Sequence, residues 1–244
     1  MPSPRTLANE GWVALARRGQ RLDNGPMGKS VSYQQGHGHQ DDRGWRGATR
    51  YLRFFGSMWM SPVNREVIRL LDIRPAEDVL DIGAGMGPGA VLAVKAGARV
   101  VAVDPTPFMR FVLGGRRLWQ PSRDRLEILD GTAEQLPVPD ASVDAAWAVN
   151  AMHHWSDLDA GIDELARVLR PGGRLILVDE DFDDPSHQDH KRFSARRRGH
   201  DVEFADVDPA EVGSKLLAAG FVVEEARNTL VAGRPAKLLR GTKS

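Results

Sequence analysis

The segment Val79-Leu-Asp-Ile-Gly-Ala-Gly-Met-Gly87 constrains the fold more than any other part of the chain. An apolar run reaches an acid, Asp81, and glycines then follow at alternate positions. Glycine lacks a Cβ, so it permits positive φ angles and lets a ligand approach the backbone closely. The apolar residues after Gly87 predict a helix whose first N–H groups face the same ligand. Residues 99–104 predict a second strand that ends in Asp104, a position where an acid commonly binds ribose hydroxyls. The pattern therefore predicts a ligand that contains a nucleoside.

The spacing of the glycines narrows the class of ligand. The loop reads Asp-x-Gly-x-Gly-x-Gly, whereas a pyrophosphate-binding loop reads Gly-x-Gly-x-x-Gly, and this loop has no Gly-Lys-Ser/Thr of a P-loop. Asp81 stands two residues before the first glycine, where a carboxylate would repel a phosphate. An acid there suits a ligand with a positive or hydrogen-donating group, such as an ammonium.

Composition sets outer limits on the function. The 244 residues suffice for one α/β domain with a sizeable core. Lys+Arg and Asp+Glu both number 33, so no overall basic field indicates a nucleic acid or an anionic membrane. The absence of cysteine excludes a disulfide framework, a thiolate metal site and a cysteine nucleophile.

Targeting signals are not evident in the sequence. The N-terminus shows no apolar stretch of signal-peptide length, and no run of eighteen apolar residues indicates a membrane helix. We therefore predict a cytoplasmic protein with no membrane partner.

From residue 78 onward, apolar runs alternate with amphipathic segments, which is typical of a parallel sheet covered on both faces. Strands are predicted at 78–82, 99–104, 125–130, 143–149, 173–180, 221–228 and about 235–241. Helices are predicted at 88–96, 105–118, 157–169 and 209–219, with a short one near 133–136. The fold class is α/β: a Rossmann-like sandwich with a mostly parallel seven-stranded sheet that ends in an antiparallel hairpin.

We divide the chain into two parts. Residues 1–64 are predicted to be a helical and loop segment that acts as a lid, with a helix starting at Pro62 and capped by Ser61. Residues 65–244 are predicted to be the ligand-binding domain, which carries a charged insert at 181–207. Residues 31–60 and the insert are the predicted substrate lids, because such segments lie over the carboxyl ends of the strands.

Four motifs occur in order, at the spacing found in one known family. They are Val79 to Gly87, Val101-Ala-Val-Asp-Pro105, Gly131-Thr-Ala-Glu-Gln-Leu-Pro137, and Asn150-Ala-Met-His-His-Trp155 followed by Glu164-Leu-Ala-Arg-Val-Leu-Arg-Pro-Gly-Gly-Arg-Leu. With these motifs the chain resembles class I S-adenosylmethionine-dependent methyltransferases. The resemblance is to the small-molecule branch related to ubiquinone-biosynthesis C-methyltransferases, and it is strong over residues 65–180.

The resemblance implies S-adenosylmethionine as the cofactor and assigns residues to its parts. Gly83 and Gly85 close over its amino-acid portion, and Asp81 supports that loop and contacts the ammonium. Asp104, followed by Pro105, accepts hydrogen bonds from the ribose. The resemblance also implies that Thr132 and the backbone N–H of Ala133 contact the adenine. It further implies that Asn150 reaches the carbonyl or amine of the cofactor.

The adenine-binding segment departs from the family. Where Gly-Asp-Ala-Glu is usual, this chain has Gly131-Thr132-Ala133-Glu134. The hydroxyl of Thr132 can accept from the adenine amino group, but more weakly than a carboxylate, by roughly a factor of two. Selectivity for adenine is the property that this change affects.

Methyl transfer needs alignment above all, and it needs a general base when the acceptor is a hydroxyl or an acidic carbon. The candidates are His153 and His154, past the fourth strand, and 179–181 at the end of the fifth; we assign the base to His154. We predict a small organic acceptor methylated on oxygen, carbon or nitrogen, and no metal.

Two alternatives remain at this point: a module that binds S-adenosylmethionine without turnover, and a nicotinamide-dependent dehydrogenase. Asn150 is followed by Ala-Met-His, so the Asn-Pro-Pro-Tyr type motif of nucleobase methylators is absent. This disfavours a nucleic-acid partner and leaves homo-oligomers open.

Overall fold

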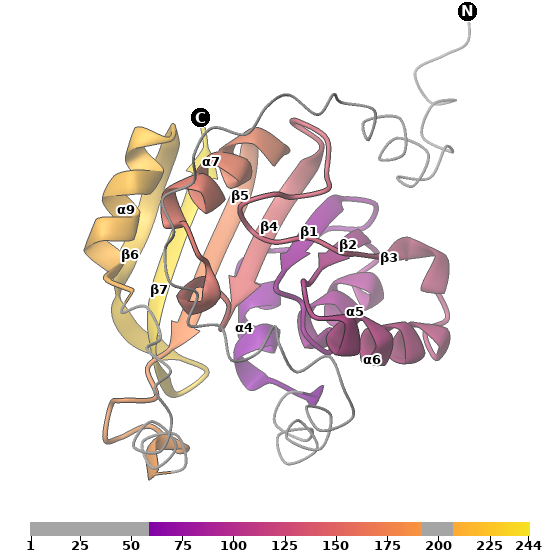
Figure 1. The fold of residues 1–244 in the computed structure, drawn as a ribbon, viewed down its shortest axis with the longest axis horizontal. Helices are drawn as coiled ribbons and strands as arrows, with labels where there is room; N and C mark the ends of the chain where they lie inside the picture. Colours follow the sequence, from indigo (N-terminus) through magenta and orange to yellow (C-terminus); the bar gives the residue numbers. More distant parts are fainter. Residues whose placement is uncertain (1–58, 192–206) are drawn as a thin grey trace, which may run out of the picture.

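A seven-stranded sheet forms the centre of the computed structural model, which describes residues 59–191 and 207–244. The strands are β1 (Asp78–Ile82), β2 (Arg99–Val103), β3 (Leu126–Leu129), β4 (Val143–Val149), β5 (Leu169–Glu180), β6 (Phe221–Val231) and β7 (Arg234–Lys243). Their spatial order is β3-β2-β1-β4-β5-β7-β6 (Figure 1). The first five strands run parallel, whereas β7 is antiparallel to β5 and β6 is antiparallel to β7. The predicted fold class is confirmed.

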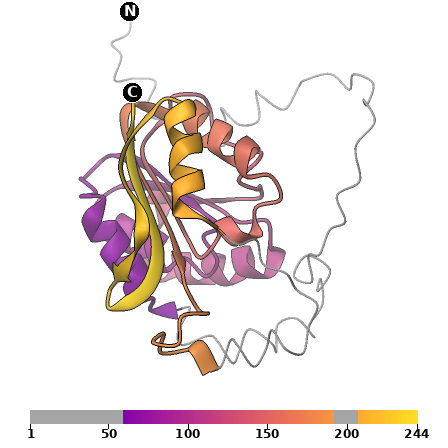
Figure 2. The same ribbon diagram turned by 90° about the vertical axis from the view of Figure 1, so that its left-hand side faces the viewer.

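Helices cover both faces of the sheet and divide the core into two clusters. α7 (Leu158–Val168) and α9 (Pro209–Ala218) pack on one face. α4 (Pro62–Leu70), α5 (Pro88–Lys95) and α6 (Pro107–Leu118) pack on the other. Figure 2 shows α4 and α9 on opposite sides of the sheet. The apolar side chains of β1, β2, β4 and β5 are buried from both sides, as parallel strands require.

Most predicted elements are present within two residues of the expected limits. The helix predicted near 133–136 is wrong: this segment is a turn with an isolated bridge between Thr132 and Gln135. Its backbone polar groups find partners on α7 instead. The Leu136 N–H donates to Glu164 at 2.7 Å, and the Arg167 guanidinium donates to the carbonyls of Leu136 and Val138. A helix would satisfy such groups locally, so these side chains replace it.

β5 begins four residues earlier than expected. Leu169 pairs with Val143, and the next pair in the register is Ala145 with Arg174. Residues 170–173 therefore loop out of the ladder and contain Gly172 at φ +78°. The segment Pro171-Gly172-Gly173 is thus a local excursion within the strand.

The C-terminal hairpin has a two-residue turn. Ala232 and Gly233 both have positive φ, at 51° and 74°, a geometry that suits the right-handed twist of the flanking strands. The turn places β7 beside β5 and β6 at the edge, which confirms the predicted hairpin at the sheet edge.

The start of α4 matches the sequence prediction. Pro62 opens the helix, and the hydroxyl of Ser61 accepts from the Asn64 N–H at 3.2 Å. Most of the lid predicted over 1–64 and most of the insert predicted over 181–207 lie outside the described residues. The division at residue 64 stays a proposal, and α4 spans it.

Candidate functional site

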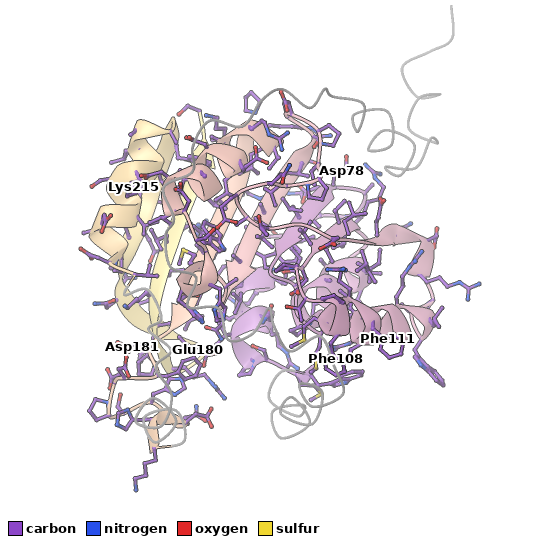
Figure 3. The ribbon with its side chains drawn as sticks, in the orientation of Figure 1. Asp78, Phe108, Phe111, Glu180, Asp181 and Lys215 are labelled. Atoms are coloured by element: carbon purple, nitrogen blue, oxygen red, sulfur yellow. The ribbon has the colours of Figure 1, made fainter. Side chains whose placement is uncertain are left out.

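The ends of the parallel strands define the edge where the predicted residues gather. Asp78, at the start of β1, lies at the opposite edge of the sheet from Glu180 and Asp181 at the end of β5 (Figure 3). Ligands of open α/β sheets bind outside the carboxyl ends of the strands. Asp104 and Asn150 directly follow β2 and β4, so both belong to this edge.

The glycine loop after β1 has a left-handed backbone at alternate residues. Gly83, Gly85 and Gly87 have φ of 66°, 54° and 72°. A Cβ at Gly83 would lie 2.6 Å from the Cβ of Ala151, and one at Gly87 would lie 2.2 Å from Leu113. A Cβ at Gly85 would meet only the Gly83 carbonyl, at 4.0 Å. Gly85 therefore borders open space, whereas the glycines on either side are packed against the protein.

Asp104 joins the end of β2 to this loop. Its Oδ2 accepts from the Gly85 N–H at 2.7 Å, and its Oδ1 accepts from the Thr106 N–H at 2.8 Å. The side chain is buried, and burial raises its pKa although these hydrogen bonds lower it. Each carboxylate oxygen keeps a second lone pair. The group is therefore held in place beside the loop and can still accept from a diol. Pro105, the next residue, is exposed.

Asp81 lies beneath the start of α5. Its Oδ2 accepts from the Ala90 N–H at 2.9 Å, and the carboxyl is 3 % exposed. Burial raises the pKa of Asp81 to about 8, with Ala90 and the Trp147 indole opposing the rise. A Cβ at Gly89 would lie 2.6 Å from the Trp147 Nε1, so the helix backbone approaches these polar groups closely. Asp81 thus supports the loop through α5, and its contact with an ammonium stays a proposal.

The wild-type protein is expected to become less stable as pH rises because of Asp81, and the variant Asp81→Asn is expected to lack this pH dependence. The pKa of Asp81 is about 8 in the folded protein and roughly 3.9 in an unfolded chain. Between these values the folded state holds a proton that the unfolded chain has released. The free energy of unfolding therefore falls as pH rises, by up to roughly 1.4 kcal/mol per pH unit. Asparagine keeps the acceptor for Ala90 without ionising. Denaturant unfolding from about pH 5 to about pH 8 measures the slope, and equal slopes in Asp81→Asn and wild type would refute the assignment.

Thr132 and Ala133 lie in the turn that replaces the predicted short helix. Ala133 is buried, and the Thr132 hydroxyl hydrogen-bonds to Glu134. Since Glu134 accepts, the hydroxyl donates to it and its oxygen remains an acceptor. Burial raises the pKa of Glu134, but hydrogen bonds from Thr132, Ser156 and Asp157 lower it overall. This arrangement suits the adenine contact implied for Thr132.

Asn150 closes the end of β4 in a left-handed conformation, φ 54°. Its Nδ2 donates to Glu180 at 2.8 Å and its Oδ1 accepts from the Glu180 N–H at 2.7 Å. Glu180 also contacts the buried His187 at 3.1 Å and Arg234 at 2.9 Å. The side chain of Asn150 thus ties β4 to β5, and its contact with the cofactor stays a proposal. The sequence placed Glu180 only within the candidate range 179–181 and gave no sign that it is the partner of Asn150.

The histidine pair follows β4 in a short 3-10 helix, η3 (Met152–His154). The His153 Nδ1 lies 3.2 Å from Asp179 Oδ2, and the His153 N–H donates to the same oxygen at 3.0 Å. His154, the predicted base, is exposed, with its ring 4.0 Å from that of His153. The structure therefore pairs His153, and not the predicted His154, with the buried Asp179, and the role of His154 as the base stays a prediction.

The loop, Asp104 and Thr132 fit a nucleoside with a charged amino-acid group. Gly85 leaves space for a ligand, Asp104 offers acceptors to a diol, and Thr132 offers an acceptor to an amino group. No group of three or more His, Cys, Asp or Glu side chains in 59–191 and 207–244 is placed to hold a metal ion.

The sheet order, the glycine loop and the acid after β2 define a Rossmann-like domain that binds a nucleoside-containing ligand. A family model described as a methyltransferase domain matches residues 80–177. The family model and the relatives described below support a class I S-adenosylmethionine-dependent methyltransferase, in agreement with the resemblance seen in the sequence.

Several known proteins are similar to this chain. Methyltransferase GfsG of Streptomyces halstedii is 34% identical over 182 residues, covering 71% of this chain and 66% of its own. A demethylmenaquinone methyltransferase of Clavibacter sepedonicus is 33% identical over 159 residues, covering 65% and 60%. The chain thus spans less than two thirds of either relative. A SAM-dependent methyltransferase from Aquifex aeolicus superposes with a TM-score of 0.62 at 20% identity, covering 80% of this chain and 98% of that one, and shows the fold.

Proposed function

We propose that the protein transfers a methyl group from S-adenosylmethionine to a small organic acceptor. The observation that carries this proposal is the hydrogen bond from the Gly85 N–H to Asp104. It joins a glycine loop that has free space beside Gly85 to an acid at the position that commonly binds ribose, at one edge of the sheet. The match to the methyltransferase family model supports the proposal. The comparisons favour neither a nicotinamide-dependent dehydrogenase nor a module without turnover.

The residues of the edge divide into those that hold the cofactor and those that face the acceptor. When bound, S-adenosylmethionine supplies an electrophilic methyl carbon on a sulfonium. Asp104 would hold the ribose, Thr132 and Ala133 the adenine, and Gly83 and Gly85 the amino-acid portion. Such binding fixes distance and orientation, which carry most of the rate in a displacement with a good leaving group.

On the acceptor side we place the proton-accepting role on His153. Its Nδ1 faces the carboxyl of Asp179, so Nδ1 carries the hydrogen and Nε2 is the basic nitrogen. Asp179 is 5% exposed, and its Oδ1 makes no hydrogen bond within the described part of the chain. His153 lies two residues after Ala151 in the chain, and the Cβ of Ala151 packs against Gly83 of the glycine loop. His153 is therefore held beside the cofactor edge, and the role predicted for His154 becomes the competing assignment.

Labelling tests the proposed function. The full chain is incubated with S-adenosylmethionine labelled on its methyl group and with a panel of phenols, naphthoquinols and small amines. A naphthoquinol is included because the name of one relative points to demethylmenaquinone. Transfer of label to an acceptor supports the enzyme, whereas tight binding of S-adenosylhomocysteine with no labelled acceptor supports a module without turnover.

The cytoplasmic location, the absence of a nucleic-acid partner and the oligomeric state remain predictions.

Asp104→Ala is expected to weaken binding of S-adenosylhomocysteine by roughly 10- to 100-fold, because charge-assisted hydrogen bonds to the ribose are lost. Titration calorimetry measures the dissociation constant. The matched control is Asp130→Ala, which removes an exposed carboxylate that pairs with Arg110 at 2.7 Å. Equal affinities in the two variants would place the ribose elsewhere.

A further inference from the structure

Helix α6 exposes large apolar side chains on the face turned away from the sheet. Phe111, Leu118 and Trp119, the residue that caps the helix, are 79%, 67% and 86% exposed. We call these three residues the α6 outer face. Figure 3 shows Phe111 along the outer side of α6. A Cβ at Gly115, between them on the helix, would meet nothing within 4 Å. Exposed apolar side chains gathered in this way mark an interaction surface rather than chance exposure.

The helix is apolar on two opposite sides. At 100° per residue, Phe111, Gly115, Leu118 and Trp119 fall on one stripe, while Met109 and Leu113 fall on the other and are buried against the sheet. Packing onto the sheet therefore explains the inner stripe only. The outer stripe needs a different partner.

Arginines lie between the outer and inner stripes on both sides of the helix. Arg116 lies on one side of it, and Arg110 and Arg117 lie on the other. The 3-10 helix η2 (Arg123–Arg125) follows directly and adds two more arginines. Residues 107–125 thus contain five arginines and one aspartate, a net charge of +4 in a chain whose formal charge is +0.

One of these arginines forms an ion pair within the described residues, and two others are held by neighbouring groups: the charge of Arg117 opposes the rise that burial causes in the pKa of Glu127, and Arg116 lies over the Trp59 ring at 4.3 Å. Arg110 pairs with Asp130, but Arg116, Arg117 and Arg125 donate to the carbonyls of Met86, Arg123 and Gly97. Within 59–191 and 207–244, no ion pair involves Arg116, Arg117, Arg123 or Arg125 (the sequence places the acids Asp124 and Glu127 nearby). The surface therefore combines apolar side chains with positive charge.

The charge of the surface decides between its candidate occupants. Residues 1–58 contain nine Lys and Arg against four Asp and Glu, so this segment carries a net charge of +5 and does not complement the arginines. A second copy of the same face would bring like charges together. A nucleic acid would match the charge, but its phosphates would leave Leu118 without an apolar partner. An anionic lipid surface satisfies both features, because acyl chains receive the apolar side chains while the exposed Arg123 and Arg125 reach the headgroups.

We propose that the α6 outer face and its flanking arginines dock the protein on anionic lipid membranes. Within residues 59–191 and 207–244 no helix is long and apolar enough to cross a bilayer, so this is contact at the surface. α6 begins three residues after Asp104 and runs back toward the start of β3, so Leu118, Trp119 and the arginines of η2 lie at the edge of the sheet opposite the cofactor edge. The overall charge balance of the chain gave no sign of this surface because the positive charge is local.

Vesicle co-sedimentation tests the proposal with the full chain. Wild type is expected to bind vesicles of phosphatidylglycerol and phosphatidylcholine at low salt, and at least about tenfold more weakly to phosphatidylcholine alone. The double variant Phe111→Ser, Trp119→Ser is expected to lose at least about tenfold in partitioning. Arg123→Gln is expected to lose roughly fivefold. The matched control is Val222→Ser, Leu230→Ser, which removes two exposed apolar side chains from β6 at the far edge of the sheet and should bind as wild type does.

Three results would overturn the proposal. Wild type and the Phe111→Ser, Trp119→Ser variant could bind vesicles equally, or wild type could fail to bind them. Sedimentation velocity could show self-association that the same variant abolishes, which would make a second copy the occupant. An RNA oligonucleotide could bind through these residues while vesicles do not. Thermal unfolding and binding of S-adenosylhomocysteine check that each variant is folded.

Discussion

Gly85→Val is expected to abolish binding of S-adenosylhomocysteine while leaving the protein folded. The space next to Gly85 is open, since a Cβ there would meet only a backbone oxygen at 4.0 Å. A valine side chain would fill the space that we assign to the cofactor. We expect the affinity measured by titration calorimetry to fall by about 100-fold or more, which corresponds to roughly 2.7 kcal/mol. The same side chain at Gly87 would collide with Leu113 and damage the fold itself, so Gly85 is the informative position.

Backbone strain has to be separated from obstruction of the site. Gly85 has φ +54°, so valine there costs roughly 1–2 kcal/mol of stability before any ligand is considered. Gly172→Val is the matched control because Gly172 has φ +78°, meets nothing within 4 Å of its Cβ position and lies in the excursion that opens β5. Both variants should unfold at similarly lowered denaturant concentration, and only Gly85→Val should lose affinity. If both or neither lose it, the loop does not hold the cofactor.

Local signals in the sequence were sufficient for the sheet and for one half of the site. Buried parallel strands are near-continuous apolar runs, and the chain turns where each run ends in an acid or an amide. Asp81, Asp104 and Asn150 could therefore be placed at one edge from the sequence. Their partners could not, because the bonds from Gly85 to Asp104 and from Asn150 to Glu180 depend on the register of neighbouring strands.

The features that the sequence did not predict correctly all depend on long-range contacts. Residues 133–136 favoured a helix by composition, but Glu164 and Arg167 on α7 bind the backbone of this segment from about thirty residues away. The outer face of α6 likewise could not be predicted from the sequence, because periodicity shows that a helix has apolar sides without showing which of them the sheet covers. Long-range contacts decided each case, and no local pattern reports them.

Asp179→Asn and His153→Gln are each expected to lower kcat by roughly 100-fold while binding of S-adenosylhomocysteine stays unchanged. The carboxyl of Asp179 holds Nδ1 of His153, with a distance of 3.2 Å, and so presents Nε2 to the acceptor. Asparagine can hold the ring in the wrong tautomer, and glutamine removes the basic nitrogen. Methyl transfer to the acceptor found by labelling measures kcat, and calorimetry measures the affinity for the demethylated product.

His154→Gln separates the two adjacent histidines. His154 is exposed and lies against the ring of His153, so its loss should change kcat only a few-fold, roughly threefold or less. A dependence of kcat on pH that disappears in His153→Gln but persists in His154→Gln would identify the titrating base. If His154→Gln loses the activity and His153→Gln keeps it, the base is His154, as the sequence predicted, and the bond to Asp179 is structural. If neither variant loses activity, the acceptor reaches the methyl group already deprotonated, and alignment alone accounts for the rate.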